Sequence, residues 1–160
     1  MIDEREFEQR ARACMPKLFR VCCAILPNAA DRDDAIQEAL LRAWKYRVTL
    51  KNDAWFETWL VRIVINECKD TLRRGRRNPQ AELTETIPAP QADAPDPVLR
   101  DALYRLDVKL RLPLVLHYLE GYKQDEIARM TGTPVGTLKH RLRRAKDMLR
   151  AELEKGGYDW

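Results

Sequence analysis

The sequence predicts an all-α protein built from two small helical domains that a flexible linker joins. Apolar residues recur at helical spacing along most of the chain, and no stretch shows the apolar–polar alternation of a β-strand. The segment 78–97 interrupts this periodicity because it contains five of the nine prolines, a composition typical of linkers. We therefore expect helical domains over 1–77 and 98–155, with 156–160 as a short tail.

Three helices are expected in the first domain. Their apolar stripes place them over residues 3–26, 33–47 and 54–74. Pro16 should kink or break the first of them near residue 15, because proline donates no backbone hydrogen bond. An aspartate in the turn 27–33 should cap the second helix. Gly75 should end the third, since glycine is common just after the last helical residue.

Four helices are expected in the second domain, over residues 98–107, 109–120, 124–131 and 134–150. Pro113 should lie near the start of the second of them. Gly132 should turn the chain between the last two, with Thr133 as the N-cap and Pro134 as the first residue of the final helix. A short helix, a glycine-containing turn and a longer basic helix have the proportions of a helix-turn-helix.

The final helix combines an apolar stripe with dense positive charge. The stripe consists of Leu138, Leu142, Ala145 and Leu149, and basic side chains cover much of the remaining surface. Such a helix can enter the major groove, where Arg and Lys read guanine edges or hold phosphates. Gly136 destabilises a helix, and a close approach of the backbone to DNA would explain it. The alternative is a solvated charged helix in a helical hairpin.

Charge is distributed unevenly around a formal net charge of +4. Residues 1–78 and 98–160 are each net basic, whereas 79–97 contain Asp and Glu but no Lys or Arg. Two basic blocks separated by an acidic connector indicate a polyanionic partner that both blocks contact.

The first domain offers two further surface features. Trp55, Phe56 and Trp59 cannot share one narrow helix face, so at least one should lie near the surface, where aromatics beside basic residues stack on unpaired bases. The alternative is that all three fill a small core. In the helix 33–47, Leu41 should lie among acids on the exposed side, which indicates a protein partner, although a single exposed leucine also occurs without any function.

We expect neither catalysis nor a metal or cofactor. The sequence contains no G-x-S-x-G, no Gly-rich phosphate loop and no H-E-x-x-H. The four cysteines lack C-x-x-C spacing and lie far from both histidines, so a zinc site is not expected. The thiols are interpreted as buried and reduced, without a redox role for Cys22 and Cys23. There is no signal-peptide pattern and no long apolar run, which indicates a cytoplasmic protein without membrane insertion of its own.

Three stretches together resemble one family. They are "DRDDAIQEALLRAW", "WFETWLVRIVINECKDTLRR" and "LPLVLHYLEGYKQDEIARMTGTPVGTLKHRLRRAKDML". The first two resemble conserved region 2, and the third resembles region 4, of the extracytoplasmic-function (ECF) sigma factors of bacteria, the minimal class with only a linker between these regions. The resemblance implies a promoter-specificity subunit with no active site. It implies as partners core RNA polymerase (the β′ clamp coiled coil and the β flap), promoter DNA and an anti-sigma factor.

The resemblance also implies roles for individual residues. Contacts with the β′ coiled coil are implied for Asp34, Gln37, Glu38, Leu41 and Arg42. Reading of the −10 element, with a base flipped from the non-template strand, is implied for Asn52, Asp53, Trp55 and Phe56, while Arg62, Asn66, Lys69, Arg73 and Arg74 would follow the DNA beside it. Reading of the −35 element in the major groove is implied for Thr133, Val135, Thr137, Lys139, His140, Arg141 and Arg144, with Arg143 on a phosphate.

Two positions depart from the family pattern, and two other functions stay open. His140 stands where the family usually has Ser, which changes the expected −35 sequence, and Asp107 stands where many members have Pro. One alternative is a sigma-like decoy that sequesters an anti-sigma factor, but the intact basic residues of the last helix argue against it. The other is a stand-alone helix-turn-helix regulator, against which the first domain argues.

Overall fold

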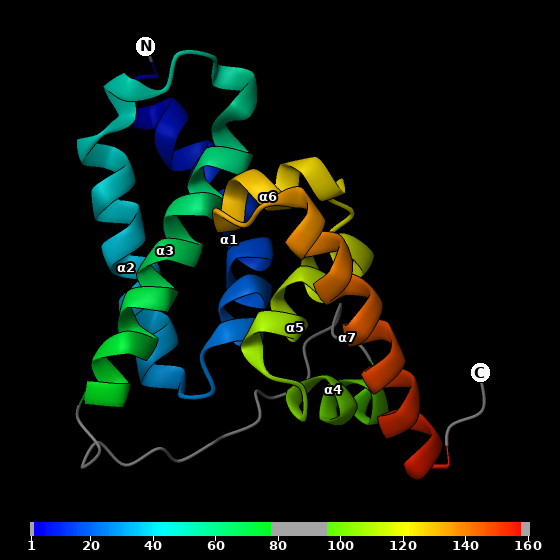
Figure 1. The fold of residues 1–160 in the computed structure, drawn as a ribbon. Coiled ribbons are helices and arrows are strands. Elements are labelled where there is room, and N and C mark those ends of the chain that lie inside the picture. The colour runs from blue at the N-terminus through cyan, green and yellow to red at the C-terminus, as the bar shows by residue number, and fades with distance from the viewer. Residues whose placement is uncertain (1, 78–95, 158–160) are drawn as a thin grey trace. The chain divides into compact units, whose positions relative to one another are not determined.

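The computed structural model describes residues 2–77 and 96–157, and every regular element within them is a helix or a helical turn (Figure 1). The chain divides into two compact units, Met1–Thr86 and Ile87–Trp160. The predicted all-α class with two helical domains is therefore confirmed. The linker prediction falls almost entirely outside the described residues, apart from Asp96 and Pro97.

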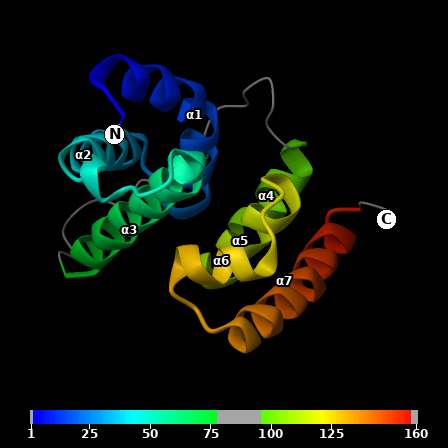
Figure 2. The same ribbon diagram turned by 90° about the horizontal axis from the view of Figure 1, so that it is seen from above.

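The first unit is a bundle of three helices that lie side by side in both views (Figures 1 and 2). These are α1 (Glu4–Ile25), α2 (Ala29–Lys45) and α3 (Phe56–Arg77), with the 3₁₀ turns η1 (Arg47–Thr49) and η2 (Asp53–Trp55) between α2 and α3. Each helix buries one stripe, and the largest fully buried side chains include Leu18, Ile25, Leu60 and Ile65. The burial of these stripes is what holds three short helices together in water.

The boundaries of these helices differ from the predictions at three points. Helix α1 runs unbroken through Pro16, which lies on the exposed side, where water can satisfy the carbonyl that loses its donor. Helix α2 begins at Ala29 because the Asn28 side chain, not an aspartate, accepts hydrogen bonds from the backbone of the first turn, at 2.8 Å from Ala30 N. Helix α3 continues past Gly75 to Arg77, since glycine weakens a helix without necessarily ending it.

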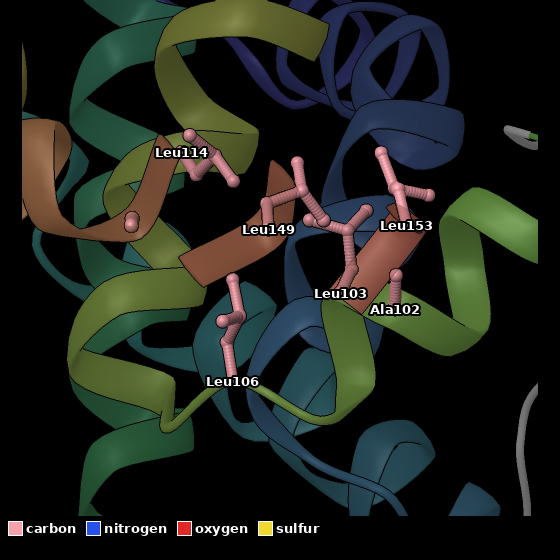
Figure 3. Packing of buried hydrophobic residues seen from close by; sticks show 7 residues of the cluster. Ala102, Leu103, Leu106, Leu114, Leu149 and Leu153 are labelled. Atoms are coloured by element: carbon pink, nitrogen blue, oxygen red, sulfur yellow. The ribbon is translucent and has the colours of Figure 1, made fainter. Parts of the chain in front are cut away.

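The second unit packs its longest helix against three short ones. Its elements are α4 (Pro97–Tyr104), α5 (Val108–Leu114), the π-helical turn η3 (Val115–Leu119), α6 (Gln124–Thr131) and α7 (Val135–Lys155). Figure 3 shows the apolar cluster between α7 and the earlier helices, formed by Ala102, Leu103, Leu106, Leu114, Ala145, Leu149 and Leu153. This cluster fixes one side of α7 and thereby decides which side faces outward.

The second unit also corrects several details. Pro97 opens α4 behind the N-cap Asp96, and Pro113 lies well inside α5 instead of near its start. A π turn follows, closed by the bond from Glu120 N to Val115 O at 3.0 Å. Thr133 does not cap α7: its hydroxyl lies 3.0 Å from that of Thr131, and its N–H donates to Ala128 O at 3.0 Å at the end of α6. Pro134 is the N-cap residue, and α7 extends to Lys155.

A buried arginine stabilises the turn between consecutive helices in each unit. Arg32 in α2 donates from Nη1 to the carbonyls of Leu26 and Pro27 at 2.9 and 2.8 Å, just after α1 ends. Arg111 in α5 donates from Nη1 to Leu106 O at 2.9 Å, just after α4 ends. Carbonyls at a helix C-terminus lack intrahelical donors, and burial keeps water from reaching them. The guanidinium groups supply the hydrogen bonds that these carbonyls would otherwise lack.

Replacing Arg32 with methionine should lower the free energy of unfolding by about 2–3 kcal/mol, because buried carbonyls lose a charged donor. Arg12→Met is the matched control, since Arg12 forms an exposed pair with Glu8, and its replacement should change stability by less than about 0.5 kcal/mol. Urea unfolding followed by circular dichroism measures both. Equal stability of the two variants would show that the buried contacts of Arg32 contribute nothing.

Candidate nucleic-acid interface

Helices α6 and α7 form a helix-turn-helix (Figure 1). The backbone N–H of Lys123 donates to Glu126 Oε1 at 3.1 Å and so closes the start of α6. Gly132 turns the chain with a φ of +66°, a conformation that side chains other than glycine rarely adopt. Helix α6 has the predicted bounds, and the predicted turn at Gly132 is also confirmed.

Helix α7 separates its apolar and polar residues as the sequence predicted. The buried stripe consists of Leu138, Leu142, Ala145, Leu149 and Leu153. Gly136, His140 and Arg143 lie at positions i, i+4 and i+7 on the opposite side and are all exposed. Lys139 and Arg144 flank them and are also exposed. The outward face of α7 is therefore a continuous basic surface that begins at the N-terminal end of the helix.

The cations of this surface pair with none of the described residues. Within the described residues, none of Lys139, Arg141, Arg143 and Arg144 forms an ion pair or a side-chain hydrogen bond. Elsewhere arginines do pair, for example Arg129 with Asp125 at 3.3 Å. No Asp or Glu occurs from residue 127 to 146, and Asp147 is the first carboxylate of α7. The like charges in the first half of the helix therefore repel one another, and a bound anion would relieve that repulsion.

The remaining predicted residues of this helix-turn-helix vary in exposure. Thr137 is exposed, and Val135 is 42% exposed at the first helical position. Thr133 and Arg141 are half-buried, and the Thr133 hydroxyl lies 3.0 Å from that of Thr131. The structure thus brings the whole predicted −35 set to the turn and the first half of α7.

The segment 52–56 presents one aromatic side chain outward and buries another. Trp55 is 58% exposed, so the prediction that at least one aromatic lies near the surface is confirmed. Phe56 is 3% exposed and packs edge-on against Phe7 with ring centroids 5.6 Å apart. The expectation that Phe56 meets a DNA base is therefore inconsistent with its burial. Asn52 is exposed, and its side chain accepts from Ala54 N at 3.0 Å, which fixes the start of η2.

A second polar face runs along α3. Its members, at i, i+4, i+7 and i+11, are Arg62, Asn66, Lys69 and Arg73, with Arg74 beside them. All are exposed except the half-buried Lys69. Arg73 pairs with Asp70 at 2.5 Å, and Arg74 donates to the Thr71 hydroxyl at 3.3 Å. Arg62 makes no such contact within the described part of the chain, and is the cation of this face most available to a phosphate.

The outer face of α2 carries the predicted protein-binding residues. Asp34, Gln37, Glu38, Leu41 and Arg42 are all exposed. Leu41 is 65% exposed, the largest value among the exposed large hydrophobic residues of the described chain. Because Ala35, Ile36 and Ala39 are buried, the division of α2 into an inner and an outer face follows the prediction.

Sequence reasoning missed Glu67, a carboxylate of α3 that is 5% exposed. Its Oε1 lies 3.1 Å from Arg42 Nε, close enough for an ion pair although the geometry does not make a hydrogen bond. Glu67 lies seven residues after Leu60 and three after Val64, so the helical spacing alone could have predicted that it lies on the buried stripe of α3. Its pairing with Arg42 could not be predicted in this way, since Arg42 belongs to another helix.

Comparisons with known proteins agree with this architecture. Sigma-70 region 2 matches residues 11–78, and Sigma-70, region 4, matches residues 98–149. The ECF RNA polymerase sigma factor SigM of Mycobacterium tuberculosis (strain H37Rv) is 35% identical over 150 residues, which cover 92% of this chain and 76% of SigM. The ECF RNA polymerase sigma-E factor of Escherichia coli K12 is 30% identical over 165 residues, covering 92% and 86%.

The chain belongs to the ECF sigma factor family. Solved structures show the same fold. The sigma factor RpoE of Bartonella quintana, crystallised with the anti-sigma factor NepR, superposes with a TM-score of 0.81 at 24% identity, covering 94% of this chain and 98% of RpoE. CnrH, solved with the cytosolic domain of CnrY, gives a TM-score of 0.70 at 26% identity over 96% and 90% of the two chains.

Membership in this family supports a role as a promoter-specificity subunit of bacterial RNA polymerase. Among residues 2–77 and 96–157 of the sigma factor, no three His, Cys, Asp or Glu side chains gather where they could hold a metal ion. Within the same residues, no helix is both long and apolar enough to cross a bilayer.

The four cysteines of the sigma factor are all free thiols. The structure brings together Cys22 of α1 and Cys68 of α3, whose Sγ atoms lie 3.5 Å apart in the core, a pair that spacing along the chain did not indicate. The hydrogen bond to Cys68, together with burial, raises the pKa of the Cys22 thiol. Burial raises the pKa of Cys14, with the nearby Glu57 adding to it, and raises the pKa of Cys23 to about 11.

Because the thiolate is the reactive form, the folded sigma factor should react slowly with N-ethylmaleimide at pH 8. A pKa of about 11 leaves roughly one part in a thousand of Cys23 as thiolate at that pH. Mass spectrometry after timed labelling, with and without 8 M urea, measures the rates, and unfolding should accelerate labelling of all four thiols. Fast labelling of Cys22 in folded protein would contradict its burial.

Proposed function

We propose that this ECF sigma factor binds core RNA polymerase and directs it to promoters that it reads at both the −35 and the −10 element. The observation that carries the proposal is the outward face of α7, where a helix-turn-helix presents four cations that form no ion pair with any described residue. Phosphates and guanine edges are the groups that such an arrangement binds most favourably.

In the proposed −35 complex, the first half of α7 lies in the major groove. The contacting residues are Thr133, Val135, Thr137, Lys139, His140, Arg141, Arg143 and Arg144. Gly136 and His140 occupy the centre of the outward face, so they would approach the DNA most closely. A Cβ added at Gly136 would meet nothing within 4 Å in the chain itself. Internal packing therefore does not require this glycine, which supports a requirement imposed by DNA.

In the proposed −10 complex, Trp55 is the stacking surface for an unpaired base, and Asn52 and Asp53 border it. A partly exposed indole offers this contact without rearrangement of the core, and stacking of a base on an aromatic ring contributes about 1–3 kcal/mol. The polar face of α3, from Arg62 to Arg74, would hold the adjacent phosphates. Phe56 supports this site from within the core.

The outer face of α2 is the proposed surface for the β′ coiled coil. Leu41 would supply the apolar contact, and the surrounding acidic and amide groups would fix the orientation. Arg42 would contact the β′ coiled coil while its guanidinium stays paired with Glu67. The β flap is the second proposed contact on core polymerase.

We also propose an anti-sigma factor as a regulatory partner. The sigma factor RpoE was crystallised with the anti-sigma factor NepR, and CnrH was solved with the cytosolic domain of CnrY. A chain of the same fold has the surfaces for such a partner to cover. Sequestration would then compete with core polymerase for the sigma factor.

Run-off transcription tests the proposed function. Purified sigma factor is mixed with core polymerase and fragmented genomic DNA of the source organism, and 5′ ends are mapped. Discrete starts that share two upstream motifs, and that vanish without the sigma factor, are expected. Core binding without any start would contradict promoter reading, and absence of core binding as well would favour a decoy or a stand-alone regulator.

Replacing Arg144 with alanine should weaken binding of the −35 duplex by about 1–3 kcal/mol, if Arg144 makes a bidentate base contact. Binding to core polymerase should not change, because Arg144 is not among the residues of the proposed α2 surface. Lys109→Ala is the control, since Lys109 is an exposed cation of α5 outside the helix-turn-helix. Fluorescence anisotropy with duplex DNA measures affinity. An equal loss of core binding in Arg144→Ala would assign α7 a structural role.

The variant Gly136→Ala should change protein stability and affinity for the −35 duplex in opposite directions. Alanine should stabilise the protein by about 0.5 kcal/mol, because it favours the helix and meets no neighbour. The same change should weaken the −35 duplex by severalfold if the backbone approaches DNA closely. Thermal unfolding and anisotropy give the two quantities. Unchanged affinity would show that DNA leaves room for a side chain at this position.

A further inference from the structure

The segment 52–56 is too short to hold its own shape and is fixed by α1. Its only regular structure is the 3₁₀ turn η2, which the Asn52 side chain closes at the start. At its end the Asp53 carbonyl accepts the N–H of Phe56, where η2 passes into α3. Three residues of 3₁₀ helix have little stability by themselves. The direction in which Trp55 points therefore depends on what holds the backbone on either side of it.

Arg10 of α1 holds that backbone directly. Its Nη1 donates to Asp53 O at 2.6 Å, a contact between residues 43 positions apart in sequence. Its Nη2 pairs with Glu6 at 3.0 Å, and its guanidinium lies 5.8 Å from the centre of the Phe56 ring. One side chain therefore binds the carbonyl before Trp55 and covers the ring after it.

Two further contacts from α1 brace the same region. Phe7, one turn before Arg10, packs edge-on against Phe56. Lys17 forms an ion pair with Glu57 in the first turn of α3. Both contacts fix the start of α3, whereas Arg10 donates directly to the backbone of η2. Arg10 is thus the group whose loss would free Trp55 without loosening the helix behind it.

We propose that Arg10 is a positioning residue for −10 reading, which sets the direction of Trp55 by holding the Asp53 carbonyl. The inference rests on the proposed function of the segment 52–56. If the segment 52–56 is already ordered before DNA binds, less conformational entropy is lost when it captures a flipped base. The affinity for the base is higher as a result. The planar guanidinium suits the task because it serves Asp53, Glu6 and Phe56 at once, which the single ammonium of lysine cannot do.

The test compares sigma factor variants assembled with core polymerase. The variants are Arg10→Ala, Arg10→Lys, Trp55→Ala, the double variant Arg10→Ala/Trp55→Ala and the control Arg12→Ala. The probe is a fluorescein-labelled single strand that carries the non-template −10 region of a promoter mapped by run-off transcription, beside a scrambled strand. Arg12 is a suitable control because it lies on α1 and forms an exposed pair with Glu8 of the same helix. Core affinity and the midpoint of urea unfolding are measured for every variant.

Arg10→Ala should weaken the single-stranded probe roughly tenfold, as expected for a lost hydrogen bond from a charged donor. Arg10→Lys should recover part of this loss, and Arg12→Ala should bind like the wild type. In the double variant the two losses should not multiply, because Arg10 acts through Trp55.

Two outcomes overturn the inference: probe binding by Arg10→Ala at the wild-type level, or losses that multiply in the double variant. If Arg10→Ala is also less stable than the wild type, the Arg10→Lys variant decides between the two explanations. Wild-type probe binding by Arg10→Lys, which lacks the guanidinium fork, would show that the fork is not needed and would overturn the inference. Equal binding of promoter and scrambled strands by the wild-type holoenzyme instead overturns the proposed −10 reading itself.

Discussion

Each unit depends on a buried arginine that binds the backbone where one helix ends and the next begins. Arg32 follows the N-cap Asn28 by four residues, and Arg111 follows the N-cap Asp107 by the same spacing. Both donate to carbonyls of the preceding turn that no helix hydrogen bond reaches. Each also lies over an aromatic ring of the preceding helix, Phe19 for Arg32 at 5.9 Å and Tyr104 for Arg111 at 4.9 Å.

These contacts fix how consecutive helices meet, and the functional surfaces follow from that. Once α2 is held against α1, its small residues Ala35, Ala39 and Ala43 are buried and the Leu41 side faces outward. Once α5 is held against α4, the two helices form the platform on which Leu149 and Leu153 of α7 pack. The ion pair of Arg105 with Glu152 at 3.3 Å adds to this docking from the exposed side. The basic face of α7 can then point only away from the unit.

The arginines of this chain serve two opposite purposes, and their neighbours decide which. Arg32 and Arg111 are buried and donate from Nη1 to backbone carbonyls, so they stabilise the fold. Those in the first half of α7 lie close together, form no ion pair within the described residues and repel one another. That repulsion weakens the free protein slightly and is relieved by a polyanion, which makes α7 a favourable site for DNA. In the segment 52–56, the structure instead anchors the backbone and leaves one indole exposed.

Periodicity along the chain was enough to predict the all-α class, the two helical blocks and the stripe on α7, because each helix can be interpreted from its own residues. The helix-turn-helix was predicted for the same reason, since Gly132 and the buried leucines are local signals. Helix starts were less predictable. The turn before α2 contains Asn28 and several aspartates, any of which could have capped the helix. Thr133 was expected to cap α7, but its N–H donates to the end of α6 and Pro134 is the N-cap residue.

The sequence by itself determined which residues are basic, which face of each helix is apolar and that the chain turns at Gly132. Only the tertiary structure decided that Trp55 is exposed while Phe56 is buried, that Arg42 meets Glu67, and that Cys22 meets Cys68. It also decided that Arg10 reaches Asp53 across 43 residues. Each of these contacts joins two different elements. Its formation depends on how each helix is rotated about its axis and how closely the two approach, which the spacing of residues within either one does not specify.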